Sequence, residues 1–212
     1  MGQSHEIQKQ LQGARVAILA TDGVERSELV EPRKALIEAG AHVEIVSIKS
    51  GTLQAWNHDE PADSIEIDHE LGQVDAEDFD ALVLPGGVMN PDNLRANEKA
   101  VEFVSRFMNE NKPIAAICHG PWTLIETGAL RGRKMTSWPS LKTDLRNAGV
   151  IWGDESVVRD GNLVTSRKPD DLPDFNRETI ALIAARETLA QNASGRTVKK
   201  ETAKGAAPSA QI

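Results

Sequence analysis

Short apolar runs of strand length alternate along the chain with segments in which apolar residues recur at helical spacing. The predicted strands are residues 15–20, 42–48, 81–84, 113–117, 134–137, 157–159 and 162–166. The predicted helices are residues 28–39, 98–110, 119–127 and 173–189. Short buried strands separated by helices are typical of a parallel sheet that is covered on both faces. The pattern therefore predicts an α/β open sandwich.

The two ends of the chain differ from its middle. Residues 1–13 are mostly polar and are predicted to form an N-terminal extension. Residues 191–212 hold almost no apolar anchor, so we expect a disordered tail there. Residues 14–190 are left as a single domain, and a chain of 212 residues with 40% apolar residues can bury a substantial core.

Composition and charge narrow the function classes. The chain has no apolar run long enough to cross a membrane and no hydrophobic signal core, so a cytoplasmic location is expected. A single cysteine fits a reducing compartment without structural disulfides. The formal net charge of −8 argues against a nucleic-acid backbone as the main partner.

Cofactor and metal motifs are absent from the sequence. It contains neither a Walker loop for phosphate nor a Gly-x-Gly-x-x-Gly dinucleotide fingerprint. His58 and His69 lie in a polar segment, residues 51–79, and lack the spacing of metal ligands. We therefore expect no metal and no cofactor.

Cys118 is the residue most suited to chemistry. It follows the apolar run 113–117 and precedes a helix that Pro121 can open, so it is predicted to lie on a sharp strand-to-helix turn. This is the arrangement of a nucleophile elbow. The nearby helix dipole would lower the pKa of the thiol and favour the thiolate. The alternative is a buried structural cysteine.

Three predicted strands are followed by segments that contain candidate catalytic or binding residues: residues 22–25, 85–87 and 118–119. Ligands of open parallel sheets bind beyond the carboxyl ends of the strands, so these segments should meet. The amides of Gly86 and Gly87 could stabilise an oxyanion, together with the amide of His119. A simple turn at Pro85-Gly86-Gly87 is the alternative.

Carboxylates and an imidazole could complete this site. Glu25 could hydrogen-bond the Cys118 sulfur or act as a base, or it could be a solvated loop residue. Glu28 and Glu31 are expected to face solvent at a helix N-terminus. His119 is a candidate base whose ring need not reach the neighbouring sulfur, and Asp92, in the predicted 90–92 loop, is the candidate to orient it.

Several motifs resemble those of the ThiJ/PfpI superfamily, most closely its PfpI-type branch of intracellular proteases and general stress proteins. They are residues 81–87 (Ala-Leu-Val-Leu-Pro-Gly-Gly), 97–101 (Asn-Glu-Lys-Ala-Val), 116–121 (Ala-Ile-Cys-His-Gly-Pro), 130–133 (Leu-Arg-Gly-Arg) and 165–167 (Thr-Ser-Arg). The resemblance covers roughly residues 14–188.

This resemblance implies a flavodoxin-like sandwich, as in class I glutamine amidotransferase-like domains, that assembles into homodimers or larger homo-oligomers. Carried over by position, Cys118 would be the nucleophile and Glu25 the carboxyl group bonded to its sulfur. His119 would be the partner histidine, and Asp92 would reach it from a neighbouring subunit.

The leading hypothesis is an enzyme that acts on reactive dicarbonyls or on their early amine adducts, as a glutathione-independent glyoxalase or deglycase. A modified nucleic acid could be a substrate, although nucleic acid is otherwise not expected as a partner. An intracellular cysteine peptidase is the alternative within the same class. It ranks second because a peptide substrate needs a longer cleft than a small aldehyde does. The alternative outside this class is a non-enzymatic oxidation sensor, in which Glu25 would hold a Cys118 sulfinate.

Overall fold

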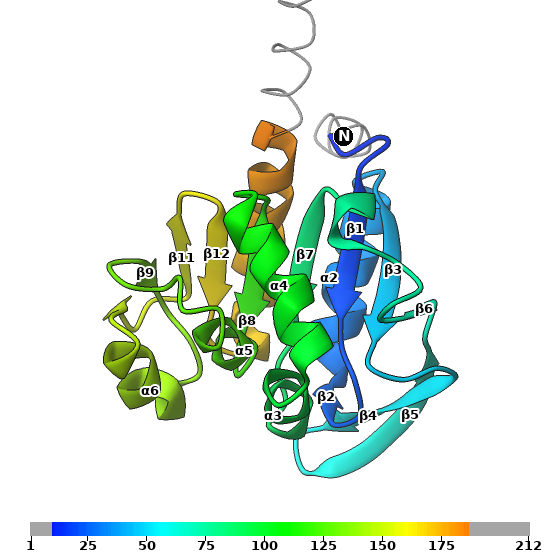
Figure 1. Ribbon diagram of the computed structural model, residues 1–212, viewed down its shortest axis with the longest axis horizontal. Helices are drawn as coiled ribbons and strands as arrows, with labels where there is room; N and C mark the ends of the chain where they lie inside the picture. The colour runs from blue at the N-terminus through cyan, green and yellow to red at the C-terminus, as the bar shows by residue number, and fades with distance from the viewer. Residues whose placement is uncertain (1–9, 187–212) are drawn as a thin grey trace, which may run out of the picture.

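A mostly parallel sheet of seven strands forms the centre of the protein (Figure 1). The structure is a computed structural model, and it describes residues 10–186. The strands in spatial order are β11 (Val157–Asp160), β12 (Leu163–Ser166), β8 (Ile114–Ile117), β7 (Ala81–Leu84), β1 (Arg15–Leu19), β3 (His42–Ser47) and β6 (His69–Glu70). The β11 strand pairs antiparallel with β12, and the other neighbours pair in parallel. The predicted α/β open sandwich is confirmed.

Helices cover both faces of this sheet. On one face α2 (Arg26–Glu38) and a C-terminal helix (residues 172–186) pack through a hydrophobic cluster that includes Leu36 and Phe175. On the other face α4 (Glu98–Asn109), α5 (Pro121–Ile125) and α6 (Lys142–Asn147) pack through a second cluster. Figure 1 shows α4 in front of the sheet and α2 behind it. Alternate residues of the central strands β1, β7 and β8 contribute to the two clusters, which explains why these strands are almost continuously apolar.

A smaller sheet lies beside the carboxyl ends of the central strands (Figure 1). It consists of β2 (Val24–Glu25) and the antiparallel hairpin of β4 (Thr52–Asn57) and β5 (Glu60–Glu66). The hairpin lies in the predicted polar segment 51–79, which ends with the 3₁₀ turn η1 (Ala76–Asp78). Polar residues dominate β5 because both of its faces are largely exposed.

Three expectations about local structure need correction. Asn90-Pro91-Asp92 is not a loop but part of α3 (Met89–Arg95), where the proline occupies a first-turn position that needs no amide donor. Of the predicted strand 134–137, only β9 (Lys134–Met135) forms, and it pairs with β10 (Ile151–Trp152) in a separate sheet. Leu11 is fully buried and donates its amide to the carbonyl of Ala39, so the core begins inside the predicted N-terminal extension.

Two other predictions fall largely outside the described residues. These are the start of the N-terminal extension and the tail 191–212. Within residues 10–186, no helix is both long and apolar enough to span a membrane.

Candidate active site

Cys118 lies on a sharp turn between β8 and α5. Its backbone has the left-handed φ of 61°, a conformation that costs free energy for any residue with a side chain. The turn is anchored because the Cys118 amide donates to the carbonyl of Ser166 over 3.0 Å, and the Gly120 amide donates to that of Ile117 over 2.8 Å. A strand, a strained residue and a helix in this order form the geometry of a nucleophile elbow.

The Cys118 side chain opens into a pocket of about 470 Å³, a size suited to small ligands. The pocket lies at the carboxyl ends of β1, β7, β8 and β12, as the topology predicts. Only 7% of Cys118 is exposed, so the sulfur is reached through the pocket rather than from the open surface.

Glu28 is the carboxyl group that contacts the sulfur. It lies in the first turn of α2 and is fully buried. Its Oε2 accepts the Gly86 amide over 2.9 Å, and the carboxyl group also interacts with the Cys118 thiol. Its Oε1 is buried without a conventional hydrogen-bond partner within the described residues. Burial raises the pKa of Glu28 to about 8, so the group is a neutral acid at neutral pH.

The expectation that Glu28 faces solvent is therefore wrong. Glu28, Pro32 and Leu36 follow one another at intervals of four residues, and all three are buried on the face of α2 that meets the sheet. This periodicity is visible in the sequence and could have placed Glu28 inside. A carboxylate at a helix N-terminus suggests a solvated position only while its face of the helix is unknown.

Glu25 does not take the predicted place on the sulfur. Its Oε1 accepts the Ser27 hydroxyl over 3.1 Å, and its Oε2 accepts the His58 amide over 2.9 Å. The His58 ring nitrogen Nδ1 lies 3.4 Å from the same oxygen. Glu25 is 7% exposed and lines the pocket, so it ties the β4–β5 turn to the pocket wall. Glu28, three positions later, contacts the sulfur instead.

The two glycines after β7 have separate tasks. The Gly87 amide, like that of His119, donates toward the Cys118 sulfur, whereas the Gly86 amide is used by Glu28. A Cβ at Gly86 would lie 2.7 Å from the Cβ of Cys118, so only glycine allows this approach. Gly87 has a φ of 77°, and a Cβ there would lie 2.2 Å from the carbonyl oxygen of Gly23. The amide pair at the sulfur is thus Gly87 with His119.

The environment of Cys118 favours the thiol over the thiolate. Burial, followed by the charge of Glu28 when it is ionised, raises the pKa of Cys118, while the two amides lower it. The expected lowering by a helix dipole does not prevail, because α5 has only five residues and the sulfur is desolvated. At neutral pH the resting site therefore holds a neutral thiol beside a neutral acid.

His119 reaches the sulfur despite being its neighbour in sequence. Its Nδ1 lies 3.3 Å from Sγ of Cys118, and its Nε2 lies 3.2 Å from Oγ of Ser140. The Trp138 ring stacks on the imidazole with centroids 5.9 Å apart. Burial lowers the pKa of His119, so the ring is neutral at neutral pH and can accept a proton. The predicted partner Asp92 is exposed in α3, and no contact between it and this ring is found within the described chain.

A model of the DJ-1/PfpI family matches residues 14–182, from the residue before β1 into the C-terminal helix. The chain belongs to the DJ-1/PfpI family. The resemblance drawn from the sequence motifs is thereby confirmed, and the shared fold is flavodoxin-like.

Relatives of this DJ-1/PfpI chain match it over nearly their whole length. The "Putative cysteine protease YraA" of Bacillus subtilis is 44% identical over 169 residues, 80% of this chain and 98% of that protein. A deglycase of Pyrococcus abyssi is 45% identical over 169 residues, 80% of this chain and 99% of that protein. The crystal structure of Drosophila melanogaster DJ-1beta superposes with a TM-score of 0.74 at 29% identity, covering 87% of this chain and 97% of that one.

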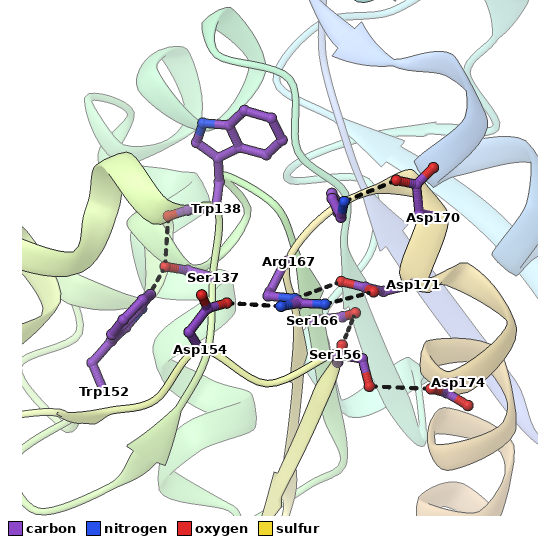
Figure 2. Close-up of polar contacts among 11 residues, drawn as sticks. Ser137, Trp138, Trp152, Asp154, Ser156, Ser166, Arg167, Asp170, Asp171 and Asp174 are labelled. Carbon is purple, nitrogen blue, oxygen red and sulfur yellow. Dashed lines mark hydrogen bonds and ion pairs between the residues drawn. The ribbon is translucent and has the colours of Figure 1, made fainter.

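The pocket mouth of this DJ-1/PfpI protein is built on an arginine network (Figure 2). Arg167 pairs with both carboxylate oxygens of Asp171 and with Asp154. This holds the 3₁₀ turn η3 (Pro169–Asp171) after β12, so that Lys168 and Asp170 line the pocket. Lys168 and Asp170 pair with each other over 2.9 Å. Sequence reasoning did not identify these mouth residues, because their meeting depends on how the β12 end faces the β4–β5 turn.

Gly120 offers a direct test of how tightly the elbow is packed. A Cβ at this position would lie 2.2 Å from the carbonyl oxygen of Leu84, which is backbone and cannot move aside cheaply. Gly120→Ala is therefore expected to lower the free energy of unfolding by about 2 to 3 kcal/mol in urea denaturation. Gly153→Ala is the matched control, since its Cβ meets only the end of the Glu155 side chain. Equal urea midpoints for the two variants would contradict the expected clash.

Proposed function

We propose that this DJ-1/PfpI protein is a cysteine-dependent enzyme that acts on small reactive dicarbonyls or on their early adducts with amines. One observation carries the proposal. The Cys118 sulfur faces a small pocket, with a neutral imidazole, a neutral carboxyl group and two backbone amides directed at it. The name of the Pyrococcus abyssi relative, a deglycase, supports the same reading.

The first step is addition of the thiol to the aldehyde carbon. As the S–C bond forms, the thiol proton passes to Nδ1 of His119, 3.3 Å away. The carbonyl oxygen becomes an oxyanion beside the sulfur, where the amides of Gly87 and His119 can stabilise it. The oxyanion then takes the proton back from the imidazolium, so that one S–H has added across one C=O bond and a hemithioacetal results.

The second step moves a hydrogen between adjacent carbons. His119, neutral again, or Glu25 in the pocket wall removes the proton from the former aldehyde carbon and returns it to the oxygen of the neighbouring carbonyl, which gives an enediol. The hydroxyl on the sulfur-bearing carbon then gives up its proton as the neighbouring carbon gains one, and the product is the thioester of a 2-hydroxy acid. Water cleaves this thioester, releases the hydroxy acid and restores the thiol. With an early amine adduct, a hemiaminal, as substrate, the sulfur displaces the amine in the first step: the C–S bond forms, the C–N bond breaks, and the thiol proton leaves on the amine through His119.

The proposal also covers the cellular location of the enzyme, its assembly and its relation to nucleic acid. We place it in the cytoplasm, where a lone cysteine stays reduced. We also propose a homo-oligomer in which Asp92 of a neighbouring subunit approaches His119, because Asp92 is exposed within its own chain. A nucleic acid would enter only as a carbonyl-modified substrate.

The test uses the purified full chain with methylglyoxal and no glutathione. Formation of lactate at a rate proportional to enzyme concentration is the expected result, since methylglyoxal plus water has the composition of lactic acid. The amine-adduct branch is tested by incubating methylglyoxal with N-acetylarginine and following recovery of the free amino acid derivative. No lactate and no amine release above the protein-free rate would remove the proposal.

Cysteine peptidase is the second candidate, favoured by the name of the YraA relative. Its discriminating assay is release of a fluorophore from short peptide amides by the same preparation. The pocket of about 470 Å³ favours a small aldehyde over an extended peptide. An oxidation sensor is less favoured, because oxidation follows thiolate character and burial raises the pKa of Cys118.

A further inference from the structure

The loop that follows β9 holds the imidazole of His119 from the side opposite the sulfur. Ser140, in the 3₁₀ turn η2 (Pro139–Leu141), places its Oγ 3.2 Å from Nε2 of His119. Trp138 covers the ring face, with an angle of 25° between the two ring planes. The ring is therefore contacted at both nitrogens and on one face by groups of the same chain.

This loop is fixed by hydrogen bonds and packing. The Trp138 amide donates to the carbonyl of Cys118 over 2.9 Å, which ties the loop directly to the elbow. Figure 2 shows the second tie: the Trp152 indole donates to the Ser137 hydroxyl over 3.0 Å, and that hydroxyl donates to the carbonyl of Trp138 over 2.9 Å. Leu141 is buried in the core. Ser140 is thus held by a rigid loop although it lies at the surface.

The groups around the sulfur bear on which nitrogen of His119 carries the ring hydrogen. The amides of Gly87 and His119 can only donate to the sulfur, and Glu28, as a buried neutral acid, also has a proton to give. The thiol proton can go to an oxygen of Glu28 or to the lone pair on Nδ1 of His119, and only the second arrangement prepares the proton transfer of the first chemical step. In that arrangement Nε2 carries the ring hydrogen, and its nearest acceptor in the same chain is Oγ of Ser140.

We propose that Ser140 is a positioning residue for His119. Its Oγ accepts the Nε2–H hydrogen bond, keeps the Nδ1 lone pair aimed at the Cys118 sulfur, and strengthens its hold when the ring takes up the thiol proton. This inference rests on the proposed function for its catalytic consequence but not for its effect on the ring. The arrangement follows the general pattern of a nucleophile, a base and a third group that orients the base.

The proposal makes a signed prediction for the titration of His119. An acceptor at Nε2 favours the imidazolium, so removing it lowers the pKa of the ring further. In Ser140→Ala, the ¹⁵N NMR titration midpoint of His119 should fall by about 0.5 pH unit or more relative to wild type. In Ser140→Thr, which keeps the hydroxyl, the midpoint should stay at the wild-type value.

Other titratable groups line the same pocket, so the measurement must be made on the ring itself. They are Glu25, Glu28, His58, Cys118, Lys168 and Asp170, and the proposed homo-oligomer would add Asp92 of a neighbouring subunit. The ¹⁵N shifts of His119 report both its tautomer and its midpoint, and they need no substrate. Failure of the dicarbonyl assay would therefore leave this test intact. Ser64→Ala, in the distant β5 strand, is the control for a general effect of losing a surface hydroxyl.

Steady-state kinetics of the Ser140 variants test the catalytic consequence of the proposal. If dicarbonyl turnover is found, Ser140→Ala should lower kcat about five- to tenfold with little change in KM, and should move the acid limb of the pH profile to lower pH. Ser140→Thr should restore both. An unchanged His119 midpoint in Ser140→Ala, as expected if water simply replaces the hydroxyl, would overturn the proposal. So would a resting ring that carries its hydrogen on Nδ1.

Discussion

Replacing Cys118 by alanine is expected to abolish dicarbonyl turnover, with a loss of at least about a thousandfold relative to wild type. The sulfur is the only thiol in the chain and the atom toward which His119, Glu28 and two amides converge. Without it no hemithioacetal can form, and the pocket can only bind substrate. Lactate production from methylglyoxal, measured without glutathione, gives the result directly.

The loss must be separated from a loss of fold. Cys118→Ala keeps a side chain at the left-handed position and removes one buried sulfur atom, so its stability should stay within about 1 to 2 kcal/mol of wild type. Cys118→Ser is the second variant. It keeps a nucleophilic atom of much higher pKa and should be almost as inactive at neutral pH. Turnover by Cys118→Ala at the wild-type rate, with binding intact, would rule out covalent catalysis by this residue.

Glu28→Ala is expected to lower kcat/KM about a hundredfold, the next largest effect. The substitution removes the carboxyl group beside the sulfur, and it leaves the buried Gly86 amide without a hydrogen-bond acceptor. Glu28→Gln is the matched variant, because its amide can accept from Gly86 and donate to the sulfur as the protonated acid does. It should retain turnover within about tenfold of wild type at neutral pH.

The pH dependence separates the two protonation states of Glu28. Its pKa is about 8, so wild-type kcat/KM should fall as the pH rises above that value, because an ionised carboxylate repels negative charge on the sulfur and on the oxyanion. Glu28→Gln should lack this alkaline fall. An alkaline limb with the same midpoint in both proteins would assign it to another group.

Stability should follow the same group with a definite sign. The folded-state pKa of Glu28 is raised from 4.5 to about 8, so its contribution is fully present below 4.5 and is lost as the pH rises toward and past 8. Over that window wild type should lose several kcal/mol relative to Glu28→Gln, since each pKa unit corresponds to about 1.4 kcal/mol. Urea denaturation of both proteins at several pH values measures the difference.

Local patterns in the sequence were enough for the framework of the site. The apolar runs before Cys118 and Pro85 have strand length, and the residues after them suit sharp turns, so both loops could be assigned to the carboxyl edge of a parallel sheet. Neighbours along the chain control these features. The elbow and the glycine pair were therefore predictable without knowledge of the remaining contacts.

Which of Glu25 and Glu28 contacts the Cys118 sulfur depends on which face of α2 packs against the sheet. Both carboxylates lie near the start of α2 and three residues apart, and a local argument favoured the one nearer the strand. The packing of α2 on the sheet instead turns Glu28 toward Cys118 and leaves Glu25 to the β4–β5 turn. The predicted lowering of the Cys118 pKa was wrong for a similar reason. Burial of the sulfur raises this pKa by more than the dipole of a five-residue helix can lower it.

By itself, the sequence determined the α/β class, the family and the position of a cysteine at the end of a buried strand. Those properties depend on residue periodicity and on short motifs, which local backbone preferences translate directly into structure. Only the tertiary structure decided which acid meets the sulfur, which nitrogen of His119 faces it, and that Ser140 stands behind the ring. These contacts join residues from separate elements, and their distances depend on how helices and loops pack around the sheet.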